Sequence, residues 1–94
     1  MTTRKRYTPA EIAQLLKSHI TQEFAYDRPD FVLTNEFKLI EERLVDSMGI
    51  FQLVTFIEEA FGIAWEPEEL VLKNFESIDH LTAFIHSKTG ETVQ

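Results

Sequence analysis

The sequence predicts an all-α protein, a small four-helix bundle with three main helices, one short third helix and a long first loop. Apolar residues recur at spacings of three and four in three separate stretches, the pattern of a helix with one buried face. No strand-like alternation persists beyond a few residues. The 94 residues fit one small domain with a modest core, to which eight phenylalanines add a large buried area.

The first helix is expected from about Pro9 to Phe24. Thr8 and Glu11 form a capping box, and proline suits the first helical position. An Arg-Pro pair follows, and because the residue before a proline avoids helical geometry, the helix should end by Asp27. Its apolar face comprises Ile12, Leu15, Leu16, Ile20 and Phe24.

A long connection from Asp27 to Val45 carries apolar residues without one clean period. Structureless loops of this length are uncommon in compact domains. We therefore expect the connection to lie across the bundle, pinned by its apolar side chains, with one helical turn near Phe37 to Glu42. Those side chains are Phe31, Leu33, Phe37, Leu39, Ile40 and Leu44.

The second helix should begin at a cap formed by Asp46 or Ser47, run to about Phe61 and stop at Gly62. The spacing of its apolar residues predicts one core-facing stripe and a less buried flank. The stripe comprises Ile50, Val54, Ile57 and Phe61, with Leu53 beside it and Met48 and Phe51 on the flank.

The remainder of the chain predicts one short helical segment and one longer helix. The short third segment opens at Glu66, with acidic residues in its first turn. Ser77 caps the last helix, whose apolar face comprises Ile78, Leu81, Phe84 and Ile85. We expect residues 8–87 to form the domain, with flexible tails at residues 1–7 and 88–94.

The composition excludes several classes of function. Nine basic and 16 acidic residues give a formal net charge of −7, which disfavours nucleic acid and suits basic protein partners. The absence of cysteine excludes disulfides, thiolate metal sites and a thiol nucleophile of the protein itself. No apolar run approaches the roughly 20 residues that span a membrane. We expect a cytoplasmic monomer that binds neither nucleic acid nor membrane.

No catalytic pattern is evident, so neither enzymatic activity nor a metal site is expected. His19, His80 and His86 lack the spacing of metal ligands. Ser47 lacks the Gly-x-Ser-x-Gly elbow of many hydrolases, because residue 45 is valine. A hydrolase would also need a base near this serine, and the sequence identifies none.

Ser47 remains the residue with chemical potential. Its simplest role is a helix cap, for which serine and aspartate are both preferred. A helix N-terminus also suits a phosphate, because its free N–H groups and positive dipole end attract anions. An exposed hydroxyl there can be joined to a phosphodiester, and Gly49 keeps the first turn small beside it.

The motif residues resemble the acyl carrier and peptidyl carrier proteins. The likeness lies in Leu44 to Ile50, in Leu53-Val54 and in the run Ile57 to Ile63, and it extends over roughly Pro9 to Ser87. It implies that Ser47 carries 4′-phosphopantetheine, with Asp46 as its motif neighbour. A phosphopantetheinyl transferase would supply the group from coenzyme A with Mg²⁺.

The resemblance also implies how the protein would work. The thiol of the arm would carry an acyl or aminoacyl group as a thioester, and the carrier itself would catalyse nothing. An adenylating or acyl-loading enzyme would load it, and enzymes of the dehydrogenase, ketosynthase or condensation type would use the cargo. Partner contacts are expected at Met48, Phe51, Gln52, Thr55 and Glu58 on the second helix.

Three residues depart from the family pattern. Arg43 stands where many relatives have glycine, so we expect the local backbone to differ from theirs. Gly49 and Gln52 stand where fatty-acid carriers have acidic residues, which leaves the front of the second helix nearly uncharged. This favours aminoacyl or peptidyl carriers of secondary metabolism, with a carrier of fatty-acid type as the alternative. Phe51 is either a flank residue folded onto the long connection or an exposed anchor for a partner.

A protein of another class also fits the sequence. It would be a helical interaction module in which Ser47 only caps a helix.

Overall fold

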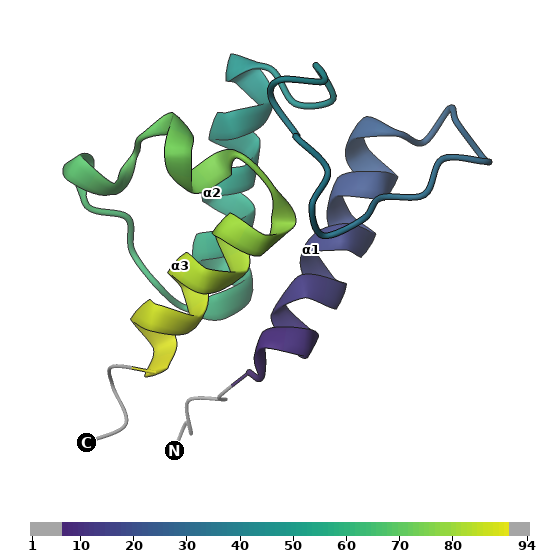
Figure 1. Ribbon diagram of the computed structural model, residues 1–94. Coiled ribbons are helices and arrows are strands. Elements are labelled where there is room, and N and C mark those ends of the chain that lie inside the picture. The colour runs from purple at the N-terminus through teal and green to yellow at the C-terminus, as the bar shows by residue number, and fades with distance from the viewer. Residues whose placement is uncertain (1–6, 91–94) are drawn as a thin grey trace.

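The computed structural model describes residues 7–90, which form three α-helices and two 3-10 turns (Figure 1). The α-helix α1 runs antiparallel to α2 and α3 (Figure 1). No strand occurs within the described residues, so the all-α class is confirmed. The elements are α1 (Pro9–Phe24), α2 (Ser47–Phe61), η1 (Pro67–Glu69), η2 (Leu72–Phe75) and α3 (Ile78–Gly90).

The first helix begins and ends where its sequence signals place it. The Thr8 hydroxyl accepts the Glu11 N–H at 3.1 Å, and the Glu11 carboxylate accepts the Thr8 N–H at 2.9 Å. The buried face differs from the prediction at two residues, because Leu15 is 39% exposed and Phe24 is only half-buried, whereas Ala13 is buried. The core-facing stripe is therefore rotated toward Ala13, and it comprises Ile12, Ala13, Leu16 and Ile20.

Aromatic contacts join α1 and the preceding residue to α2. The His19 ring stacks on Phe56 with centroids 3.7 Å apart, and burial lowers the pKa of His19. Tyr7 packs edge-on against Phe61 at 5.0 Å, and its hydroxyl donates to the Ala60 carbonyl at 3.5 Å. Tyr7 therefore belongs to the domain and not to the predicted N-terminal tail, of which residues 1–6 lie outside the described part.

Helix α2 ends as predicted but buries a different stripe. Gly62 has φ of 68°, a left-handed conformation that favours glycine, and its N–H bonds to the Glu58 carbonyl. Leu53 is fully buried, whereas Ile50 and Val54 are only half-buried. The predicted stripe is confirmed only in part at these positions, because Ile50 and Val54 pack against the core and also face a surface groove. The buried residues of α2 are Gly49, Leu53, Ile57 and Phe61.

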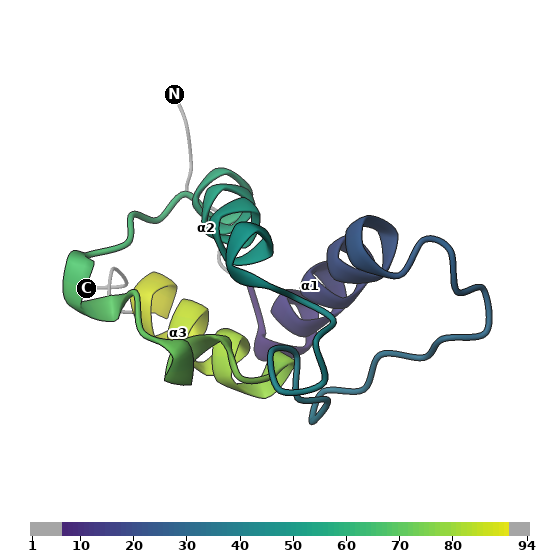
Figure 2. The same cartoon turned by 90° about the horizontal axis from the view of Figure 1, so that it is seen from above.

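The long connection between α1 and α2 is pinned to the bundle, as expected. It extends outward past α1 and returns to the start of α3 before it reaches α2 (Figure 2). There the Leu39 N–H donates to the Glu76 carbonyl at 2.9 Å, and the Asp79 N–H donates to the Asn35 carbonyl at 3.0 Å. Leu33 and three other side chains of the connection are buried in the core, namely Leu39, Leu44 and Val45.

A single helical turn over residues 38–42 ends at Arg43, and it confirms the turn expected there. The Arg43 N–H donates to the Ile40 carbonyl, and the Leu44 N–H donates to the Leu39 carbonyl, both at 3.0 Å. This pair of bonds is a Schellman motif, which requires a left-handed residue at the position of Arg43. Arg43 has φ of 64°, so the arginine adopts the conformation that a glycine would favour.

Replacing Arg43 with glycine should raise the free energy of unfolding by about 1 kcal/mol. Left-handed geometry costs an L-residue roughly 1–2 kcal/mol, and the extra entropy of glycine in the unfolded chain offsets part of the gain. Urea denaturation measures the change, and Arg43→Ala is the control that removes the charge but keeps the unfavourable φ. A glycine variant less stable than the alanine variant would contradict the assigned backbone.

The segment after α2 forms η1 and η2 instead of a short third α-helix, so the described residues contain three α-helices. Isolated helices of this length are marginal in water without tertiary packing, and in these turns only Phe75 is buried. Helix α3 follows Ser77, whose hydroxyl accepts the His80 N–H at 3.3 Å. It continues to Gly90 with Thr89 buried, so residues 88–90 are not the predicted tail.

Residues 91–94 lie outside the described part. None of the helices within residues 7–90 combines the length and the apolarity needed to cross a bilayer.

Candidate functional site

Ser47 is the first residue of α2, and its side chain is exposed. The cap of this helix is Asp46, whose carboxylate accepts the Gly49 N–H at 2.9 Å. The Ser47 hydroxyl makes no hydrogen bond with the residues that the structure describes. Of the two caps that the sequence left open, the structure therefore selects Asp46, and the serine hydroxyl remains free for chemistry.

The backbone around Ser47 suits an anion. Asp46 is extended with φ of −101° and ψ of −171°, and the helix begins directly after it. The first N–H groups of a helix have no intrahelical partner, and here only that of Gly49 is taken by the cap. The first turn of α2 carries no acidic side chain, so the Asp46 carboxylate at the cap is the negative group that faces the positive end of the helix dipole.

Gly49 allows the end of α1 to approach the first turn of α2. A Cβ atom at this position would lie 2.7 Å from Cε1 of Phe24 and 2.9 Å from Cγ1 of Val45. Both distances are below van der Waals contact, so a larger side chain would displace the Phe24 ring or the Val45 methyl. The absence of an acidic side chain at position 49 is therefore coupled to the packing of α1 on α2.

An apolar groove of about 380 Å³ begins at Ser47. It lies between one flank of α2 and the segment that contains η1 and η2. Sequence periodicity did not predict the second side, because the three consecutive apolar residues Leu70, Val71 and Leu72 join two 3-10 turns and match neither a helical nor a strand period. The lining contains no charged residue and comprises Ser47, Ile50, Phe51, Val54, Leu70, Val71, Leu72 and Phe75.

The predicted partner residues differ in their surroundings. Met48 is 70% exposed and Phe51 is 69% exposed, and Gln52 and Thr55 are also exposed. Phe51 borders the groove, so it is not folded onto the long connection. Glu58 is half-buried, and its carboxylate accepts the Trp65 N–H at 3.2 Å, which makes it a structural contact within the chain.

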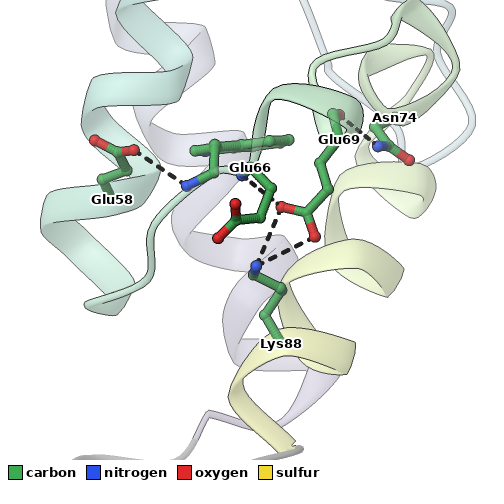
Figure 3. Close-up of polar contacts among 6 residues, drawn as sticks. Glu58, Glu66, Glu69, Asn74 and Lys88 are labelled. Carbon is green, nitrogen blue, oxygen red and sulfur yellow. Dashed lines mark hydrogen bonds and ion pairs between the residues drawn. The ribbon is translucent and has the colours of Figure 1, made fainter.

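Figure 3 shows a network of polar contacts around Glu69, which belongs to the segment on the far side of the groove. The Glu69 carboxylate accepts the Glu66 N–H at 2.8 Å and the Lys88 ammonium at 3.1 and 3.2 Å. The Asn74 amide donates to the Glu69 carbonyl at 2.7 Å. The hydrogen bond from the Glu66 backbone, together with Lys88, lowers the pKa of Glu69, so this carboxylate is ionised at neutral pH.

Aromatic stacking fixes both ends of the same segment. The Trp65 ring stacks on Phe75 with centroids 5.0 Å apart, and on Phe84 of α3 with centroids 4.3 Å apart. Phe75 is buried in the core. The residues between Trp65 and Phe75 therefore form an arch whose two ends are held together by ring contacts.

A second serine meets a histidine and a carboxylate at the start of α3. The Ser77 hydroxyl lies 2.8 Å from Nδ1 of His80, and Nε2 of His80 lies 3.3 Å from the Glu76 carboxylate. Ser77 is only 3% exposed, and its hydroxyl caps α3, so a substrate has no access to it. No group of three or more potential metal ligands occurs among the described residues.

No family model matches the chain, and its comparison with curated proteins gives no match either. The likeness of the Leu44 to Ile50 motif to carrier proteins therefore stays a resemblance of residues. The structure adds an exposed and unbonded hydroxyl at the positive end of a helix, beside an apolar groove. Such a position can carry a phosphate-linked group without breaking any contact of the fold.

Asp46→Ala should lower the free energy of unfolding by about 1 kcal/mol, because it removes the cap of α2. Ser47→Ala should change it by less than about 0.5 kcal/mol, because its hydroxyl bonds to nothing in the domain. Urea denaturation of the two variants beside wild type measures both effects. A larger loss in Ser47→Ala than in Asp46→Ala would show that the serine is the cap.

Proposed function

We propose that the protein is a discrete carrier that holds an acyl or aminoacyl group as a thioester on a 4′-phosphopantetheine arm at Ser47. One observation carries the proposal: the Ser47 hydroxyl is exposed and unbonded, while its neighbour Asp46 caps the helix. A serine used only as a cap would direct its hydroxyl to the backbone. The carrier motif and the free hydroxyl thus coincide at one residue.

The residues present fit the arm. The Ser47 side chain is open to solvent, and the unpaired N–H groups at the start of α2 can face the phosphodiester. A phosphopantetheinyl transferase with Mg²⁺ would align coenzyme A so that the Ser47 oxygen attacks its β-phosphorus. The new serine–phosphorus bond replaces the pyrophosphate linkage, adenosine 3′,5′-bisphosphate leaves, and the serine proton passes to a base on the transferase or to water.

The arm would supply the thiol that this cysteine-free chain lacks. The chain's own part is to present that thiol and to dock partners, and we propose no catalysis by the carrier. Met48, Phe51, Gln52 and Thr55 lie exposed on α2 for such docking. The turns η1 and η2 lie between α2 and α3, where the resemblance to carrier proteins leads us to expect a short third helix. A cytoplasmic monomer remains part of the proposal.

Co-expression with a broad-specificity phosphopantetheinyl transferase should add the mass of one phosphopantetheine to the wild-type protein. Ser47→Ala should add none, because it lacks the attacking oxygen. Intact-protein mass spectrometry measures both, and Ser77→Ala is a matched control that should gain the full mass if it folds. An unmodified wild type, or a Ser47→Ala variant that gains as much as wild type, would end the carrier proposal.

The cargo we propose is an aminoacyl group loaded by an adenylating enzyme. Gly49 is buried under Phe24, and Gln52 is neutral, so the front of α2 offers no acidic residue to the basic surfaces of fatty-acid enzymes. Malonyl transfer to the modified protein by a fatty-acid malonyltransferase should therefore be slow. Efficient malonyl loading, measured by mass spectrometry, would favour the fatty-acyl alternative.

The alternative is a helical interaction module in which Ser47 only caps a helix. Because Asp46 provides the cap of α2, the structure disfavours the role that this alternative gives to Ser47.

A further inference from the structure

The groove beside Ser47 has two sides of different character. The α2 side belongs to a helix packed on the core. The other side, here called the wall segment, consists of residues 66–75. Leu70, Val71 and Leu72 of this segment are 47%, 46% and 64% exposed, and only Phe75 is buried. Of the apolar side chains of the wall segment that line the groove, Phe75 therefore anchors its end, whereas the exposed Leu70, Val71 and Leu72 hold it in place much less.

Glu69 holds the middle of the wall segment. It directly precedes the three exposed apolar residues, and Figure 3 draws its contacts with Glu66, Asn74 and Lys88. Two of its partners, Glu66 and Asn74, belong to the wall segment itself. Lys88 is the partner that comes from α3, and its ammonium reaches both oxygens of the Glu69 carboxylate.

The ion pair between Glu69 and Lys88 is shielded from water in part. The two side chains are 25% and 21% exposed, and the Lys88 ammonium also lies 5.7 Å from the centre of the Phe84 ring. A pair in such surroundings is screened less than one on an open surface. Trp65 and Phe75 fix only the two ends of the wall segment. The ion pair between Glu69 and Lys88 is therefore the polar link between its middle and α3.

We propose that Lys88 is a positioning residue that, through Glu69, sets the distance of the wall segment from α2 and so the width of the groove beside Ser47. Loss of the positive charge on Lys88, by substitution or by acylation of its amine, would detach the middle of the arch. Leu70, Val71 and Leu72 would then leave α2, and the groove would open. The charge at the far end of α3 thereby regulates the apolar surface next to the modified serine.

An introduced cysteine reports the width of the groove directly, because the natural chain has none. Ile50 is half-buried in the lining of the groove, so Ile50→Cys places a thiol under the wall segment. Alkylation of this thiol by iodoacetamide should be about fivefold faster when Lys88→Met is added, the size of effect that one partly shielded ion pair supports. Lys88→Arg, which keeps the charge, should leave the rate unchanged.

Further variants separate the link from other effects. Thr55→Cys lies exposed on α2 outside the groove, and its alkylation should not respond to Lys88→Met. Glu69→Gln should accelerate alkylation of the Ile50→Cys thiol as Lys88→Met does, and the two changes together should be no faster than either alone. If Lys88→Met does not fold, the alkylation rate in the Glu69→Gln background alone tests the proposal. The proposal would be overturned if the alkylation rate of the Ile50→Cys thiol stayed within twofold when Lys88→Met, Glu69→Gln or both were added.

The consequence for partner enzymes rests on the proposed function. In the phosphopantetheinyl transferase reaction, Lys88→Met should raise the KM for the carrier about threefold and leave kcat unchanged, because docking and not chemistry is altered. If KM is unchanged while thiol alkylation is faster, Lys88 has no role in partner docking, but its control of the wall segment through Glu69 stands. A wild type that is never modified would reject the carrier function, while the alkylation result would still decide the role of Lys88.

Discussion

The hydrogen bond from the Gly49 N–H to the Asp46 carboxylate is the interaction on which the site depends. It starts α2 and so places Ser47 at the first helical position with its hydroxyl unused. The same glycine lets Phe24 pack against this first turn. One short stretch therefore has two roles. Gly49 lets α1 and α2 pack closely, and Ser47 of the same stretch faces solvent.

The long connection delivers that stretch to the correct place. Leu39 joins it to the start of α3 through the Glu76 carbonyl, and a Schellman motif then turns the chain toward α2. The left-handed Arg43 shows that the geometry of this turn is imposed by its surroundings. Leu39 and Leu44, at the two ends of the motif, are both buried in the core, and their burial offsets the unfavourable conformation of the arginine.

Two kinds of force hold the two sides of the groove. Leu53 and Ile57 anchor α2 by complete burial, which is insensitive to charge. The wall segment depends on stacked rings at its ends and on Glu69 and Lys88 in its middle. Polar links of this type respond to modification of the charged groups, so the groove combines a rigid side with one that can be adjusted.

Local signals in the sequence determined the helices, because caps and breakers act over a few residues. Thr8 and Glu11 marked the start of α1, and Gly62 marked the end of α2. The Asp46-Ser47 pair was likewise visible as a helix start. Choosing the cap between its two residues required the structure, because both residue types satisfy the same N–H groups.

Tertiary packing alone decided the rest, including the exposure of Leu15 and Phe51 and the burial of Thr89. Periodicity defines a helix face but not the direction in which its neighbours lie. The ion pair beside the groove joins Glu69 to Lys88, 19 positions apart in the sequence. No local sequence pattern indicates such a contact.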